Sequence, residues 1–180
     1  NTVALLALAL VATIVLYDAV HKHIEAAPFL MAACRLLLYL VAGAATFHSV
    51  NESVFWHGLA LAAYIVGLSS LARKQSGQGG VSFWPMLFLV IPLAANVVVN
   101  PSRSAFSWLA FVALVVWLGW CLRGFFNQAK PNVGRVVAGL LAGIVLVDGS
   151  AVAQLTMGIA LAFLGLFLLA LLLQRKIPAT

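Results

Sequence analysis

Long apolar runs alternate with short polar segments along the whole chain. A helix of about 20 residues is needed to cross a ~30 Å hydrocarbon core. The runs predict seven membrane-spanning helices, at 3–17, 28–46, 54–72, 83–99, 105–124, 135–152 and 155–174. Polar residues between Val147 and Thr156 also permit a re-entrant break in place of the last loop. The fold class expected is all-α, a polytopic transmembrane bundle forming one domain over residues 1–180.

The composition agrees with this pattern. Of 180 residues, 64% are hydrophobic and 8% are charged, whereas a soluble domain is about half apolar and a quarter charged. The two cysteines, Cys34 and Cys121, lie inside apolar runs, which is typical of small core residues. The net charge of +6 comes from loops between spans, so it does not indicate a nucleic-acid partner.

The basic residues also predict an orientation. Loops and span ends on one side carry eight of them, and the other side carries Arg103 alone; the eight are Lys22, Arg73, Lys74, Arg123, Lys130, Arg135, Arg175 and Lys176. Because positive charge favours the cytoplasmic side, we expect the visible N-terminus outside and the C-terminus in the cytoplasm, in a bacterial or organellar inner membrane. The chain begins Asn-Thr-Val and is apolar by residue 3, so we expect further spans upstream.

The stretch from Tyr17 to Gly43 gathers ionisable residues within an otherwise apolar chain, namely Asp18, His21, Lys22, His23, Glu25 and Arg35. If a helix begins at Pro28, Arg35 lies roughly 10 Å along its axis. A charged group at that depth in a membrane is costly and marks a candidate functional site.

Two interpretations of this cluster stay open. In the first, Asp18 pairs with Lys22 at i,i+4 on a continued helix, His21 pairs likewise with Glu25, and Arg35 pairs with one of the two carboxylates. In the second, Lys22, His21, His23 and Arg35 form an anion site, since a guanidinium in a partly buried mouth needs a carboxylate or phosphate partner.

Neighbouring residues add to the anion-site hypothesis. Met31, Arg35 and Tyr39 recur at i+4 and share a helix face. Arg73 and Lys74 add two cations on the same predicted side, although topology alone accounts for them. His48 and His57 have no spacing typical of a metal site.

Other spans carry residues that predict packing. Asn96 is expected to hydrogen-bond between helices, and Asp148 to be a hydrogen-bonded core carboxylate. Gly139, Ala142 and Gly143 form a small-residue face suited to close helix contact.

The segments Tyr17-Asp-Ala-Val-His-Lys-His23, Leu30-Met-Ala-Ala-Cys-Arg35 and Leu38-Tyr-Leu-Val-Ala-Gly43 resemble UbiA-type intramembrane prenyltransferases, in particular the divergent EboC-like branch. The resemblance covers the chain as the second half of that fold, with the first three family spans absent. Tyr17 and Lys22 match approximately the Tyr and Lys that follow the fourth family span and line the diphosphate pocket.

The resemblance implies transfer of an isoprenyl group from its diphosphate to an acceptor. Lys22 and Arg35, with Tyr17, would be catalytic; Asp18, His21, His23, Tyr39, Arg73 and Lys74 would bind the substrate. The family uses Mg²⁺ held by two aspartate-rich motifs. The second motif should fall at 73–82, where the chain has no carboxylate, so this segment offers no ligand for magnesium.

Three functions therefore remain open from the sequence. The first is a prenyltransferase acting on an isoprenyl diphosphate within membrane lipid. The second is a non-catalytic protein that binds or transports isoprenoids or lipids. The third is a structural subunit that packs against other membrane subunits.

Overall fold

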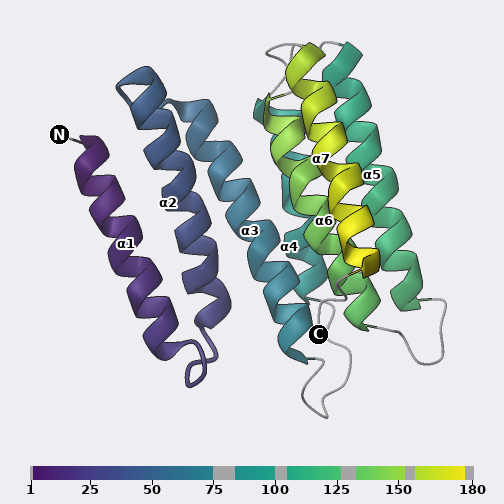
Figure 1. The fold of residues 1–180 in the computed structure, drawn as a ribbon, viewed down its shortest axis with the longest axis horizontal. Coiled ribbons are helices and arrows are strands. Elements are labelled where there is room, and N and C mark those ends of the chain that lie inside the picture. Colours follow the sequence, from purple (N-terminus) through teal and green to yellow (C-terminus); the bar gives the residue numbers. More distant parts are fainter. Residues whose placement is uncertain (1, 75–83, 100–104, 127–132, 153–156, 177–180) are drawn as a thin grey trace. The chain divides into compact units, whose positions relative to one another are not determined.

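The computed structural model describes residues 2–74, 84–99, 105–126, 133–152 and 157–176 (Figure 1). Every regular element in these ranges is an α-helix, which confirms the predicted fold class. The helices are α1 (Thr2–Val20), α2 (Ala27–Phe47), α3 (Glu52–Lys74), α4 (Trp84–Val99), α5 (Ala105–Phe126), α6 (Val133–Val152) and α7 (Met157–Lys176).

Six of the described helices are long and apolar enough to cross a membrane, and α4 is an apolar helix of 16 residues. The chain is therefore an integral membrane protein. Asp148, Gly149 and Ser150 continue α6 as helix up to Val152; the rest of the predicted break, 153–156, lies outside the described residues.

By its internal contacts the chain divides into two compact units. We call residues 1–69 with 84–95 the N-terminal unit, and residues 70–83 with 96–180 the C-terminal unit. The boundary between the units falls within α3 and within α4. Each unit has its own core, in which Leu61, Tyr64 and Leu89 are buried in the first and Leu114 and Leu140 in the second.

Close approaches at glycines bring the helices of the N-terminal unit together. A Cβ built at Gly43 of α2 would lie 2.6 Å from the Val54 side chain of α3. A Cβ built at Gly67 of α3 would lie 2.6 Å from the backbone carbonyl oxygen of Pro85 in α4. Between α2 and α3, the Ser69 hydroxyl donates to the Met31 sulfur at 3.3 Å. The polar and small residues of these spans thus serve packing between helices.

Proline positions follow the backbone rules for helices. Pro28 lies in the first turn of α2, where its missing N–H removes no helical bond. Pro85 occupies the corresponding first described turn of α4, whereas Pro92 lies inside that helix. At the other end of α2, His48 is the C-cap in the left-handed region, with φ of 56°. That conformation ends the helix, which gives His48 a structural role.

The C-terminal unit is joined around α6, against which α5 and α7 both pack (Figure 1). The Trp117 Nε1–H of α5 donates to the Gly139 carbonyl at 2.9 Å, and the Gln174 amide of α7 donates to the Ala138 carbonyl at 2.9 Å. Two successive carbonyls of α6 thus accept hydrogen bonds from its two neighbours.

Small residues and one amide complete this packing as the sequence predicts. Gly139, Ala142 and Gly143 are all buried, and a Cβ at Gly139 would lie 2.8 Å from the Cys121 sulfur. Asn96, at the end of α4, is buried, and its amide donates to the Ser150 carbonyl of α6 at 3.4 Å. The predicted interhelical role of Asn96 is therefore confirmed.

Candidate functional site

The ionisable cluster lies on the turn between α1 and α2. α1 ends at Val20, and backbone hydrogen bonds close the turn: His21 N–H to the Tyr17 carbonyl at 2.8 Å, and His23 N–H to the Val20 carbonyl at 2.9 Å. Lys22 and His23 stand exposed on this turn. Because the helix stops at Val20, Asp18 and Lys22 do not share a helical face. The i,i+4 ion pair that a longer helix would form is therefore not built here.

Two contacts position the His21 ring in the turn. Its ring stacks on Tyr17, with ring centroids 5.2 Å apart and an interplanar angle of 23°. Its Nδ1 lies 3.1 Å from the Asp18 carbonyl oxygen, so an Nδ1–H donates there and Nε2 is the nitrogen left for a ligand. The stacking therefore places the Tyr17 ring next to the His21 imidazole.

Arg35 lies eight residues after Ala27, roughly 12 Å along the α2 axis. Its side chain is exposed, where the sequence predicts a partly buried one. Asp18 lies on α1, which packs against α2, the helix that carries Arg35. Among the described residues, no ion pair joins Arg35 to Asp18.

The helix face that Met31, Arg35 and Tyr39 share packs in part against α3. The Met31 sulfur accepts the hydrogen bond from Ser69. A Cβ built at Gly58 would lie 2.9 Å from the Tyr39 Cβ, so the base of Tyr39 packs on α3. Met31 and Tyr39 thus anchor α2 against α3, and Arg35, set between them in the sequence, is exposed.

The other predicted cations lie at the end of α3, beyond the boundary of the N-terminal unit. Arg73 is exposed and takes part in an interaction in the structure. Lys74 is the last residue of α3. The remainder of the segment where the family would carry its second acidic motif, 75–82, lies outside the described residues.

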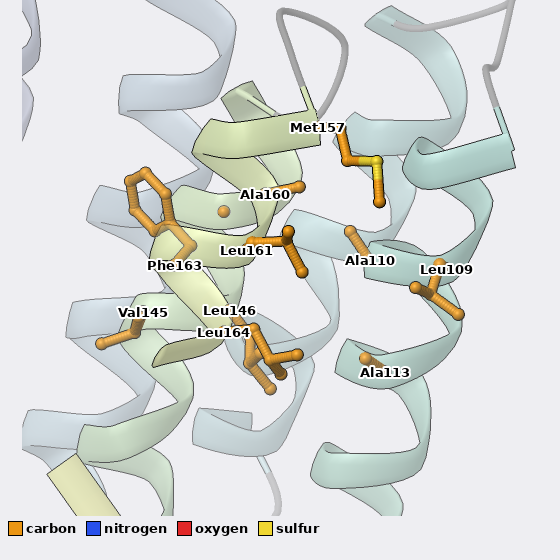
Figure 2. A pocket seen from close by; sticks show the side chains of 11 residues that line it. Leu109, Ala110, Ala113, Val145, Leu146, Met157, Ala160, Leu161, Phe163 and Leu164 are labelled. Atoms are coloured by element: carbon orange, nitrogen blue, oxygen red, sulfur yellow. The ribbon is translucent and has the colours of Figure 1, made fainter. Parts of the chain in front are cut away.

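A separate pocket of about 360 Å³ lies in the C-terminal unit, between the first halves of α5 and α7 and the last turns of α6 (Figure 2). Its lining is apolar throughout: Leu109, Ala110, Ala113, Val145, Leu146, Gly149, Met157, Ala160, Leu161, Phe163 and Leu164. None of the predicted site residues lines it. The sequence signal that could have found it is the run of small residues on facing spans.

His48 and His57 lie near the end of α2 and the start of α3, away from the α1–α2 turn, and each has a structural role within its own segment. His57 is buried, and its Nδ1 lies 2.7 Å from the Ser53 carbonyl oxygen. Nearby, the Trp56 indole N–H donates to the Glu52 carboxylate at 3.3 Å. Within the described ranges, no three His, Cys, Asp or Glu residues gather as a metal site would require.

The cluster thus consists of an ordered turn with Lys22 and His23 exposed, a positioned His21, and an exposed arginine on the next helix. Such groups can bind a phosphate or diphosphate oxygen through charge-assisted hydrogen bonds. Comparison of the chain with protein families, curated proteins and solved structures gave no match.

Proposed function

We propose that this chain binds an isoprenyl diphosphate with its diphosphate at the α1–α2 turn, and that it serves prenyl transfer of the UbiA type. The observation that carries the proposal is the pair of exposed cations, Lys22 on the turn and Arg35 on α2. A charged side chain within a spanning helix is rare and is retained for a charged partner. A diphosphate offers such a partner, and an isoprenyl tail is compatible with the surrounding hydrocarbon.

In the proposed reaction, the bond between the allylic carbon and the diphosphate oxygen breaks. The electron pair leaves with the diphosphate, and an acceptor nucleophile then bonds to the allylic carbocation and loses a proton. Lys22 and Arg35 would stabilise the negative charge that develops on the leaving group. His21, held by Tyr17 and the Asp18 carbonyl, would present Nε2 to the same head group.

The second candidate is an isoprenoid- or lipid-binding protein without catalysis. It is favoured by the segment 73–82, which has no carboxylate for magnesium, and by the wholly apolar pocket in the C-terminal unit. A structural subunit is favoured by α1, none of whose residues is buried, so that its surface is available to lipid or to another subunit.

Equilibrium binding to the chain in detergent tests the proposed head-group site. We expect geranylgeranyl diphosphate to bind about a thousandfold more tightly than geranylgeraniol, since the two cations each contribute a charge-assisted hydrogen bond of about 1.5–3 kcal/mol. Equal affinity for the two ligands would remove the diphosphate site. Release of pyrophosphate on adding an aromatic acceptor separates the transferase from the non-catalytic binder.

The proposal also fixes an orientation, with the α1–α2 turn on the cytoplasmic side. In a chain with Cys34 and Cys121 replaced by alanine, we expect His23→Cys and Lys130→Cys to be labelled by an impermeant maleimide only from the cytoplasmic side. Arg103→Cys should be labelled only from the opposite side, because the basic residues are distributed eight against one. The reverse pattern would place the cluster on the wrong face for a cytoplasmic isoprenyl diphosphate.

A further inference from the structure

The pocket between α5, α6 and α7 goes beyond the proposed function, because it lies in the other unit and shares no residue with the α1–α2 turn. All eleven lining residues belong to the spanning segments of these three helices. Figure 2 shows Met157 and Leu161 projecting from α7 into the space that faces Ala110 and Ala113 on α5. The space exists because Ala110 and Ala113 of α5 have short side chains, and the longer side chains of Met157 and Leu161 on α7 form its wall.

The lining decides what can fill this space. Water needs two to four polar partners to occupy a cavity, and the side chains around the pocket offer none. A head group or a peptide backbone would leave its own polar groups without hydrogen bonds there, at a cost of several kcal/mol each. Only hydrocarbon fits without such a loss.

The size of the pocket suits part of a lipid. A cavity of 150 Å³ accommodates benzene; by that proportion the ~360 Å³ here holds roughly a dozen carbon atoms. This is one acyl chain rather than a whole lipid. The rim is also open, since Leu109 is 67% exposed and Leu161 is 56% exposed. A chain can therefore enter from the side, while the rest of the lipid stays outside.

We infer that the pocket between α5, α6 and α7 is a binding site for one acyl chain of a membrane phospholipid. Phospholipid is the hydrocarbon present at the highest concentration around a spanning helix, and a void in a spanning segment forfeits the packing contacts that a chain restores. The free energy of binding comes from packing contacts. The hydrophobic effect adds little, because an acyl chain in the bilayer is already out of water.

Photolabelling in nanodiscs tests the site. The probe is a phosphatidylcholine with a diazirine midway along one acyl chain, diluted into palmitoyl-oleoyl phosphatidylcholine, with adducts mapped by peptide mass spectrometry. We expect labelling of Met157 and Leu161 to exceed that of Leu172, an exposed residue of α7 outside the pocket, by about fivefold, because a held chain stays in contact with close-packed walls.

A matched pair of variants separates the pocket from the helix surface. Ala160 lines the pocket, whereas Ala162 lies exposed on the same helix outside it. Ala160→Phe should lower labelling of Met157 and Leu161 about fivefold by filling the space, and Ala162→Phe should leave it unchanged. If Ala160→Phe does not fold, Ala113→Leu narrows the pocket from α5 and should act in the same direction. The site would be overturned if Met157 and Leu161 were labelled no more strongly than Leu172. Equal loss of their labelling in Ala160→Phe and Ala162→Phe would also overturn it. Protection of these residues by another helix or a second copy would do so too.

Discussion

The double variant Lys22→Ala/Arg35→Ala is expected to lose affinity for geranylgeranyl diphosphate by about a thousandfold. Each cation is expected to contribute a charge-assisted hydrogen bond of about 1.5–3 kcal/mol, and each single variant should then lose about 30-fold. Titration calorimetry of the detergent-solubilised chain measures these losses. The two effects need not add, since both side chains bind one head group.

Controls distinguish local binding from net charge. Arg123 is an exposed cation in the last turn of α5 and belongs to the C-terminal unit; Arg123→Ala should bind like the unaltered chain. Lys22→Arg keeps the charge and should retain most of the affinity. If Arg123→Ala lowered affinity as far as Lys22→Ala, the effect would be one of overall charge, and the turn would lose its assignment.

Replacing Gly67 by alanine is expected to cost about 2–3 kcal/mol of stability, the range for overpacking a close-packed site. The added methyl would lie 2.6 Å from the Pro85 carbonyl oxygen and 3.2 Å from the Leu89 side chain. A backbone oxygen cannot rotate away as a flexible side chain does, so α3 and α4 must separate. For a chain of this size, the midpoint of thermal unfolding should fall by roughly 5–10 °C, measured by circular dichroism in detergent.

The matched control for this variant is Gly165→Ala. Gly165 lies inside α7, and a Cβ built there meets nothing within 4 Å. The change should raise the unfolding midpoint slightly, because alanine favours the helix by about 1 kcal/mol over glycine. Equal destabilisation by the two variants would mean that the contact between α3 and Pro85 does not set the packing of the N-terminal unit.

The helices could be predicted because each depends on its own sequence. An apolar run of about 20 residues that spans a membrane must satisfy its own backbone hydrogen bonds, which favours a helix. Accordingly, α2 extends over Ala27–Phe47 where the pattern predicts 28–46. Asn96 and the small face at Gly139 were also predictable, since an amide or a glycine inside a spanning run has few uses other than contact between helices.

The candidate site was less predictable, because it depends on where helices end and how they turn. The i,i+4 pairing of Asp18 with Lys22 required α1 to continue beyond Val20, where it ends. The polar residues that follow contain no signal that fixes the last residue of the helix. The exposure of Arg35 depends on the contacts that Met31 and Tyr39 make with α3. The apolar pocket depends on three helices meeting at their small residues, which no single span reveals.

The central claim is that Lys22 and Arg35 hold a diphosphate head group. It is tested most directly by the ratio of affinities for geranylgeranyl diphosphate and geranylgeraniol, measured in the unaltered chain and in Lys22→Ala/Arg35→Ala. Both ligands carry the same tail, so a change in how the tail binds alters both affinities and cancels in their ratio. We expect a ratio of about one thousand in the unaltered chain to fall to about one in the double variant. A ratio that is the same in both would contradict the claim.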